Sequence, residues 1–246
     1  MHLDPLHQFK IKELFRVNLF GLEISVNNSV ASMVVTTLFA IALLLFSTRK
    51  IKVKNISKLQ AFVEMLFNLS VGPFESAMGQ KIDKNYKPYS KYIFTIFSMI
   101  LFLNLQSMIP TSFAATGQFA VTLAAGLTVM LVTLIMMFKK HGFKLFGSFI
   151  PAGTPIWMTP LMFILELISF LIRPISLCIR LGANMIAGHV MMEVLAVLVV
   201  SGGFLYGPFA FVLMVAIDMM EFGVVCLQAY IFASLSSVYI SQAAHH

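Results

Sequence analysis

The amino-acid sequence predicts an all-α integral membrane protein, with about five transmembrane helices, an interfacial amphipathic helix, and a last pair of helices that are long and strongly tilted. Of its 246 residues, 59% are hydrophobic and only 11% are charged, whereas soluble domains carry about 25% charged residues. Long uncharged stretches alternate with short basic clusters, as expected where helices cross a bilayer and the loops between them remain in water. We therefore expect one membrane domain over residues 1–246.

The N-terminal part contains one segment that is suited to span the membrane. Residues 1–23 mix acidic and basic side chains without the layout of a signal peptide, and we expect them to form a segment on the outer side. Residues 24–48 carry no charge, and they exceed the roughly 20 apolar residues that one transmembrane helix needs.

Residues 57–76 are predicted to form a helix that lies at the membrane interface. The segment is too polar to span, and its apolar side chains Phe62, Leu66 and Leu69 recur at helical spacing, with Glu64 off their face. This periodicity is typical of an amphipathic helix.

The middle of the chain is predicted to form a transmembrane hairpin. Residues 92–138 contain no charge and are about twice as long as one span. Proline, glycine, serine and threonine interrupt this stretch at 110–117, which indicates a turn between two helices.

Residues 155–242 are predicted to form a second hairpin whose two helices are unusually long. The apolar stretch breaks only at 201–203, where a serine is followed by two glycines. A helix from 155 to about 188 alone would be roughly 50 Å long, whereas the hydrocarbon core is about 30 Å thick. Such a helix must tilt strongly, kink near Pro160 or Pro174, or run partly along the membrane interface.

The basic loops predict how the chain is oriented. Loops 49–91 and 139–144 carry most of the lysines, so they are placed on the cytoplasmic or matrix side, with the uncharged turn 110–118 outside. Five spans then place the N-terminus outside and the C-terminus inside. The net charge of +7 comes mainly from these loops, so no nucleic-acid partner is expected.

Charged side chains are rare in the apolar C-terminal part, because a charge at the bilayer centre costs at least about 2.5–3.5 kcal/mol. They are Glu166, Arg173, Arg180, Glu193, Asp218 and Glu221. The first three are spaced by seven residues and Asn184 lies four beyond Arg180, so these four share one helical stripe. Asp218, Glu221 and Gln228 form a second stripe on the next helix. Two such stripes predict a hydrated path for an ion, and we expect a proton.

Simpler interpretations of these residues remain open. Glu166 and Arg173 could form a structural ion pair, and His189 could be a hydrogen-bonded core side chain. Cys178 and Cys226 lie in apolar runs, so neither a disulfide nor a metal site is expected.

The segment PISLCIRLGANMIAGH at 174–189 resembles the penultimate helix of subunit a of F-type ATP synthases, which carries Arg-Leu, Asn-Met and Ala-Gly in this order. The resemblance extends over nearly the whole chain. Its further elements are Asn104 with MIP at 108–110, PAGTP at 151–155, Glu166, and LQAYIF at 227–232. The order of His189 and Glu221 resembles the mitochondrial and alphaproteobacterial branch, whereas Gly182 and Ser107 depart from residues common at those positions.

This resemblance implies a stator subunit beside a rotating ring of c subunits, each with a carboxyl group inside the membrane. Arg180 would be the essential arginine that separates two offset proton half-channels, with Gln228 facing it. An arginine suits this function because it keeps its charge and cannot pass the proton on.

The other polar residues would line the two half-channels. His189, Glu221 and Asn184 would serve the outer one, and Glu166 would serve the inner one. All expected proton-translocation residues are Arg180, Glu221, His189, Asn184, Gln228, Glu166, Asp218 and Arg173.

The resemblance also implies partners and a location. The partners are the c-ring, the peripheral-stalk subunit b and the lipid bilayer, and the location is an energy-coupling inner membrane, bacterial or mitochondrial. The chain would be no enzyme by itself, because a proton relay makes no covalent bond, and no cofactor or metal is expected. A proton-coupled secondary transporter is the alternative. Such proteins usually show internal repeats, but no other part of this sequence repeats the pattern of charged residues at 166–228.

Overall fold

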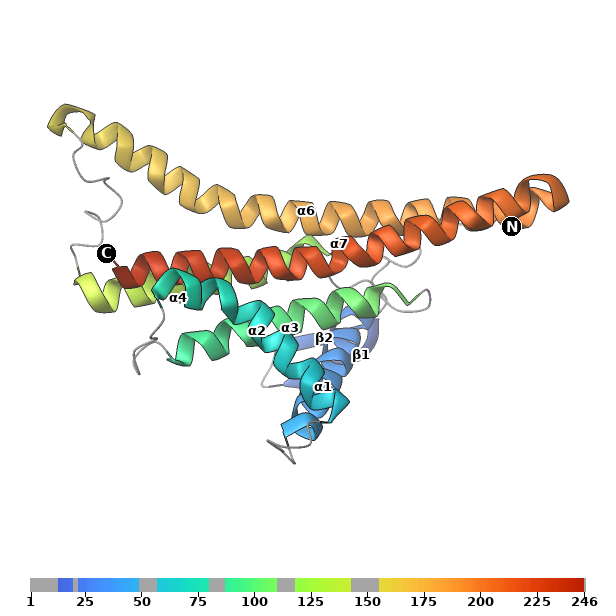
Figure 1. Ribbon diagram of the computed structural model, residues 1–246, viewed down its shortest axis with the longest axis horizontal. Helices are drawn as coiled ribbons and strands as arrows, with labels where there is room; N and C mark the ends of the chain where they lie inside the picture. Colours follow the sequence, from blue (N-terminus) through green and yellow to red (C-terminus); the bar gives the residue numbers. More distant parts are fainter. Residues whose placement is uncertain are drawn as a thin grey trace.

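The computed structural model describes residues 13–19, 22–48, 57–79, 87–109, 118–142 and 155–245. Its elements, in chain order, are β1 (Glu13–Leu19), β2 (Leu22–Asn27), α1 (Asn28–Thr48), α2 (Lys58–Met78), α3 (Lys87–Ser107), α4 (Phe119–His141), the 3-10 helix η4 (Ile156–Met158), α6 (Thr159–Ser201) and α7 (Gly203–His245) (Figure 1). The predicted helical architecture with two long C-terminal helices is confirmed.

A β-hairpin precedes the first helix, and the sequence analysis did not anticipate it. β1 and β2 pair antiparallel, with Val17 opposite Ile24. Val17, Ile24 and Val26 are β-branched and Phe15 is aromatic, and such residues favour extended backbone. As a result α1 begins at Asn28, a few residues later than the expected span.

Four helices in the described part of the chain are long and apolar enough to cross a membrane: α1, α4, α6 and α7. α3 has the same length as α1, 21 residues, but it starts with Lys87 and Lys91 and is less apolar. Eleven of its residues are buried, so α3 is enclosed by other helices. A fifth span at α3 stays a prediction.

α6 and α7 contain 43 residues each, which corresponds to roughly 65 Å and is about twice the thickness of a hydrocarbon core. Figure 1 shows that α6 is bent: its later part lies along α7, and its first part diverges from it. Pro174 lies inside α6, and because proline has no N–H, it leaves one backbone carbonyl of the preceding turn without its helical partner. The two helices meet at Gly202 and Gly203, and the positive φ of 57° at Gly203 permits the reversal.

α7 is the centre of the packing. It contacts α2, α3, α4 and α6, and its small residues Ala229 and Ala233 are fully buried. Small side chains let neighbouring helices approach closely inside a membrane. α1 packs mainly on α3, to which a hydrogen bond of 2.8 Å from Gln106 Nε2 to Ser32 Oγ ties it.

The apolar side chains of α2 differ in how deeply they are buried. Leu66 is buried, but Phe62 and Leu69 are 44% and 47% exposed. The packed face runs through Val63, Leu66, Ser70 and Phe74 and lies against α3 and α7. The helix therefore has two apolar faces, one towards the bundle and one outward.

Candidate functional site

A cavity of about 170 Å³ lies between α6 and α7. Three of the polar residues expected from the two stripes line it: Asn184 from α6, and Glu221 and Gln228 from α7. The rest of the wall is apolar apart from Gly188. Residues that lie far apart in the sequence thus form one narrow polar site.

Glu221 occupies the space that a glycine leaves free. Its side chain is only 8% exposed, and a Cβ added at Gly188 would lie 2.8 Å from its Oε2 and overlap the rest of its carboxyl group. Any larger residue at 188 would displace the carboxyl. Gly188 therefore fixes where Glu221 can lie.

The carboxyl and amide groups of the cavity are not hydrogen-bonded to one another. Glu221 Oε1 and Gln228 Oε1 are buried, and neither has a hydrogen-bond partner among the described residues. The two side chains are seven residues apart on α7, so they lie two turns apart on the same face. A carboxyl can take up and release a proton, and amides can orient a hydrogen-bonded chain beside it. This arrangement suits proton transfer.

Arg180 lies one helical turn before Asn184, and its side chain is exposed. Residues 180, 184 and 187 share a face of α6, and two of them, Asn184 and Ala187, line the cavity. The α6 wall of the cavity therefore continues towards the guanidinium group. In the part of the chain that is described, Arg180 forms no ion pair.

The structure does not gather the remaining predicted residues in this cavity. Glu166 and Asp218 are exposed, and Glu166 lies about 21 Å before Arg180 along the helix. His189 is half-buried beside Gly188 but does not line the cavity. Arg173 belongs to α6, but its side chain lies outside the part of the structure that is described. The predicted ion pair between Arg173 and Glu166 therefore stays a prediction.

Polar groups of α3 lie behind the cavity, and the sequence analysis gave them no function. Met185 lines the cavity and is 1% exposed, and its Sδ accepts a hydrogen bond of 3.5 Å from Ser107 Oγ. Asn104, one turn earlier on α3, is fully buried, and its amide atoms have no partner among the described residues. In the sequence, Asn104 and Ser107 stand out as two polar residues three positions apart within an apolar stretch, and this spacing could have indicated their shared position.

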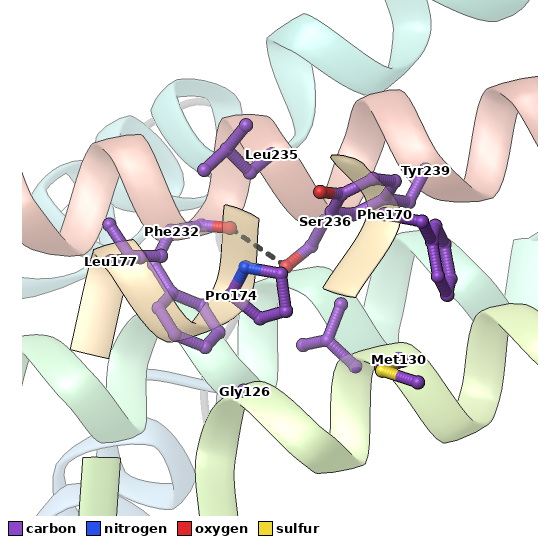
Figure 2. A pocket seen from close by; sticks show the side chains of 10 residues that line it. Gly126, Met130, Phe170, Pro174, Leu177, Phe232, Leu235, Ser236 and Tyr239 are labelled. Atoms are coloured by element: carbon purple, nitrogen blue, oxygen red, sulfur yellow. Dashed lines mark hydrogen bonds between the residues drawn. The ribbon is translucent and has the colours of Figure 1, made fainter. Parts of the chain in front are cut away.

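A second, smaller cavity of about 20 Å³ lies at the bend of α6. Figure 2 shows Pro174 and Phe170 of α6, Gly126 and Met130 of α4, and Ser236 and Tyr239 of α7 around it. Ser236 Oγ donates a hydrogen bond of 2.7 Å to the carbonyl of Phe232 in its own helix. The lining is largely apolar, so this cavity is a gap in the packing beside the proline.

Gly126 brings α4 close to α6 at the same bend. A Cβ at this position would lie 3.1 Å from Cys178 Sγ and 3.4 Å from Pro174 Cβ. The Cys178 thiol donates a hydrogen bond of 2.9 Å to the carbonyl of Thr122. Cys178 thus acts as a packing residue, and no cluster of three or more histidine, cysteine or acidic side chains suited to a metal occurs in the described segments.

Two comparisons with known proteins bear on this site. Residues 30–241 match the family model described as ATP synthase A chain. The chain is also 37% identical to a protein named ATP synthase subunit a from Wolbachia sp. subsp. Drosophila simulans (strain wRi), over 244 residues that cover 99% of each chain. The matched region includes α2, α3, α4 and α6, and nearly all of α1 and α7.

Proposed function

The chain belongs to the ATP synthase A chain family, and from that premise we propose that it provides two offset proton half-channels to a rotating ring of c subunits. As a member of this family it is a non-catalytic, multi-pass membrane subunit of the Fo sector. The observation that carries the proposal is the cavity shared by Asn184, Glu221 and Gln228, one turn from Arg180. Family membership leaves the alternative of a secondary transporter without support.

The outer half-channel uses the cavity between α6 and α7. A proton arrives at Glu221 by way of His189, which lies next to Gly188 on α6, and Asn184 and Gln228 orient the hydrogen-bonded chain. From there the proton neutralises a carboxylate of the ring. The neutral site can then enter lipid, because moving an ionised carboxylate into an apolar medium is far more costly.

Arg180 separates the two half-channels. Its exposed position on α6 lets its charge face a neighbouring subunit, so it attracts a ring carboxylate that has lost its proton. Because guanidinium stays protonated in proteins, it blocks direct transfer between the two paths.

The inner half-channel starts at the opposite end of α6. Glu166 is exposed near the start of that helix, and Arg173 follows at the same helical phase. Asp218, exposed on α7, lies one turn before Glu221 and adds negative charge beside the outer path. The roughly 21 Å between Glu166 and Arg180 gives the two half-channels the offset that rotation requires.

The exposed faces of α6 and α7 supply the surface for ring and lipid. They carry many large apolar side chains, among them Ile172, Ile179, Phe209 and Met219. The basic loops orient the N-terminus to the outer side and the C-terminus to the cytoplasmic or matrix side of an energy-coupling inner membrane. Subunit b of the peripheral stalk is the further partner.

Substitution of Arg180 tests this function. Arg180→Ala in the assembled complex should abolish ATP-driven proton pumping, measured with a pH-sensitive dye in membrane vesicles, and Arg180→Lys should not restore it. Ile135→Ala, at an exposed position of α4, is the control and should pump normally. Normal coupled pumping by an assembled Arg180→Ala complex would show that this arginine does not separate the paths.

A further inference from the structure

A third cavity, of about 590 Å³, lies between the end of α2 and the start of α3, away from the proton path. Its lining combines three charged side chains, two serines, a glycine and one aromatic ring. These residues are Phe67, Glu75, Ser76, Gly79, Lys87, Ser90 and Lys91. Its lining contains more charged side chains than either of the two cavities described above.

The charges of the cavity sum to one positive charge. Lys87 and Lys91 are one turn apart on α3, and both are exposed, as is Glu75 on α2. No ion pair joins Glu75 to either lysine among the described residues. The Ser90 hydroxyl is already used, because it donates a hydrogen bond of 2.8 Å to the carbonyl of Lys87. The two ammonium groups are therefore available to an anion that carries one negative charge.

One wall of the cavity is aromatic. Phe67 packs edge-on against Phe94 of α3, with ring centroids 5.2 Å apart. A site with a charged rim and an aromatic wall fits a molecule with a charged head and an apolar tail better than it fits a small free anion.

The position of the lysines along α3 matches the headgroup layer of a bilayer. The apolar stretch of α3 begins at Tyr92, directly after Lys91, and Lys87 lies about 6 Å before Lys91 along the helix. Tyr89 and Tyr92 flank this boundary, where tyrosine is enriched in membrane proteins. Basic pockets between helices on the cytoplasmic or matrix side are suited to anionic headgroups.

From these observations we propose that the cavity between α2 and α3 binds the headgroup of an anionic phospholipid. Lys87 and Lys91 hold the phosphodiester, and the Phe67 wall supports the start of an acyl chain. Glu75 weakens the site by repulsion and so limits its affinity. This lipid site is independent of the proton path proposed above.

The test is lipid binding by the full-length chain in dodecyl maltoside, followed by native mass spectrometry with dioleoyl phosphatidylglycerol. The double variant Lys87→Gln/Lys91→Gln should raise the Kd about 25-fold, which is about fivefold for each lysine. Glu75→Gln should lower the Kd several-fold. The matched control Lys58→Gln/Lys139→Gln removes two exposed lysines outside the cavity and should leave the Kd within about twofold.

Four outcomes would overturn the proposal. An equal rise in Kd in the two double variants would mean that basic residues attract the lipid only in a general way and that the cavity forms no specific site. Displacement of the lipid by millimolar inorganic phosphate, or equally tight binding of dioleoyl phosphatidylcholine, would mean that the site does not recognise an anionic lipid. In the assembled complex, Lys87 and Lys91 should become open to acetylation after delipidation, and persistent protection would mean that a neighbouring protein covers them.

Discussion

Gly188→Ala places the smallest possible side chain where the carboxyl of Glu221 lies. The added Cβ would be 2.8 Å from Oε2, whereas ordinary van der Waals contact begins at 3.4 Å. Oε1 and the carboxyl carbon would lie closer still, so the whole carboxyl group must move away from the added Cβ. Because Glu221 contributes the end of a flexible side chain, it can rotate away without a backbone shift.

The expected effect on stability is small, whereas the effect on proton transfer is larger. Overpacking costs about 1–3 kcal/mol, and the flexible partner places this substitution near the lower end of that range. The retreat takes the carboxyl out of line with Asn184 and Gln228. If the altered geometry adds about 1.4 kcal/mol to the barrier for proton uptake, conduction falls about tenfold.

Passive proton conduction through Fo in membranes freed of the catalytic sector is the appropriate assay, with thermal unfolding of the assembled complex as the measure of stability. Gly223→Ala is the matched control, because it lies on α7 with nothing within 4 Å of an added Cβ. This control should conduct normally, and alanine should be slightly more stable than glycine in a helix.

A second substitution tests the cause. Glu221→Asp shortens the side chain by one methylene group, so in the Gly188→Ala background it should recover part of the lost conduction, although alone it should reduce conduction. If Gly188→Ala conducts as well as Gly223→Ala, the contact between Gly188 and Glu221 does not control proton transfer. If Glu221→Asp worsens the Gly188→Ala variant, the steric explanation is wrong.

Three further substitutions test the proton path and the packing that supports it. Glu221→Gln keeps the side-chain volume but removes the titratable group, so passive conduction should fall at least about tenfold while the complex still assembles; unchanged conduction would contradict a relay through this residue. Gly126→Val forces α4 away from Cys178, whose Sγ lies 3.1 Å from an added Cβ, and should lower the free energy of unfolding by about 1–3 kcal/mol. Adding Cys178→Ala should restore part of this stability; if it restores none, the strain does not arise at Cys178. Gly79→Ala, at the C-cap of α2, should also destabilise by about 1–3 kcal/mol, since φ of 76° and ψ of 160° are open to glycine alone. Gly72→Ala, inside α2 and equally free of contacts, should not destabilise.

The sequence predicted the helical elements well where hydrophobicity and charge were unambiguous. The uncharged stretches and the glycine pair at 202–203 led to the long C-terminal hairpin, which the structure contains as α6 and α7. The β-hairpin before α1 was missed, because short strands carry a weak signal beside a long apolar run. For α2 the sequence placed Phe62, Leu66 and Leu69 at one helical phase, but only the structure shows that Leu66 is buried while Phe62 and Leu69 lie on the outward side.

Within the site, the sequence by itself determined which residues can share a face. Spacing by three, four and seven residues puts Arg180 with Asn184, and Glu221 with Gln228, because the helical period is fixed by the backbone. Only the tertiary structure decided that these two faces meet in one cavity and that Gly188 lies opposite Glu221. Rotation and register between two helices depend on how side chains of different elements pack, and in an apolar chain many such arrangements satisfy the same hydrophobic pattern.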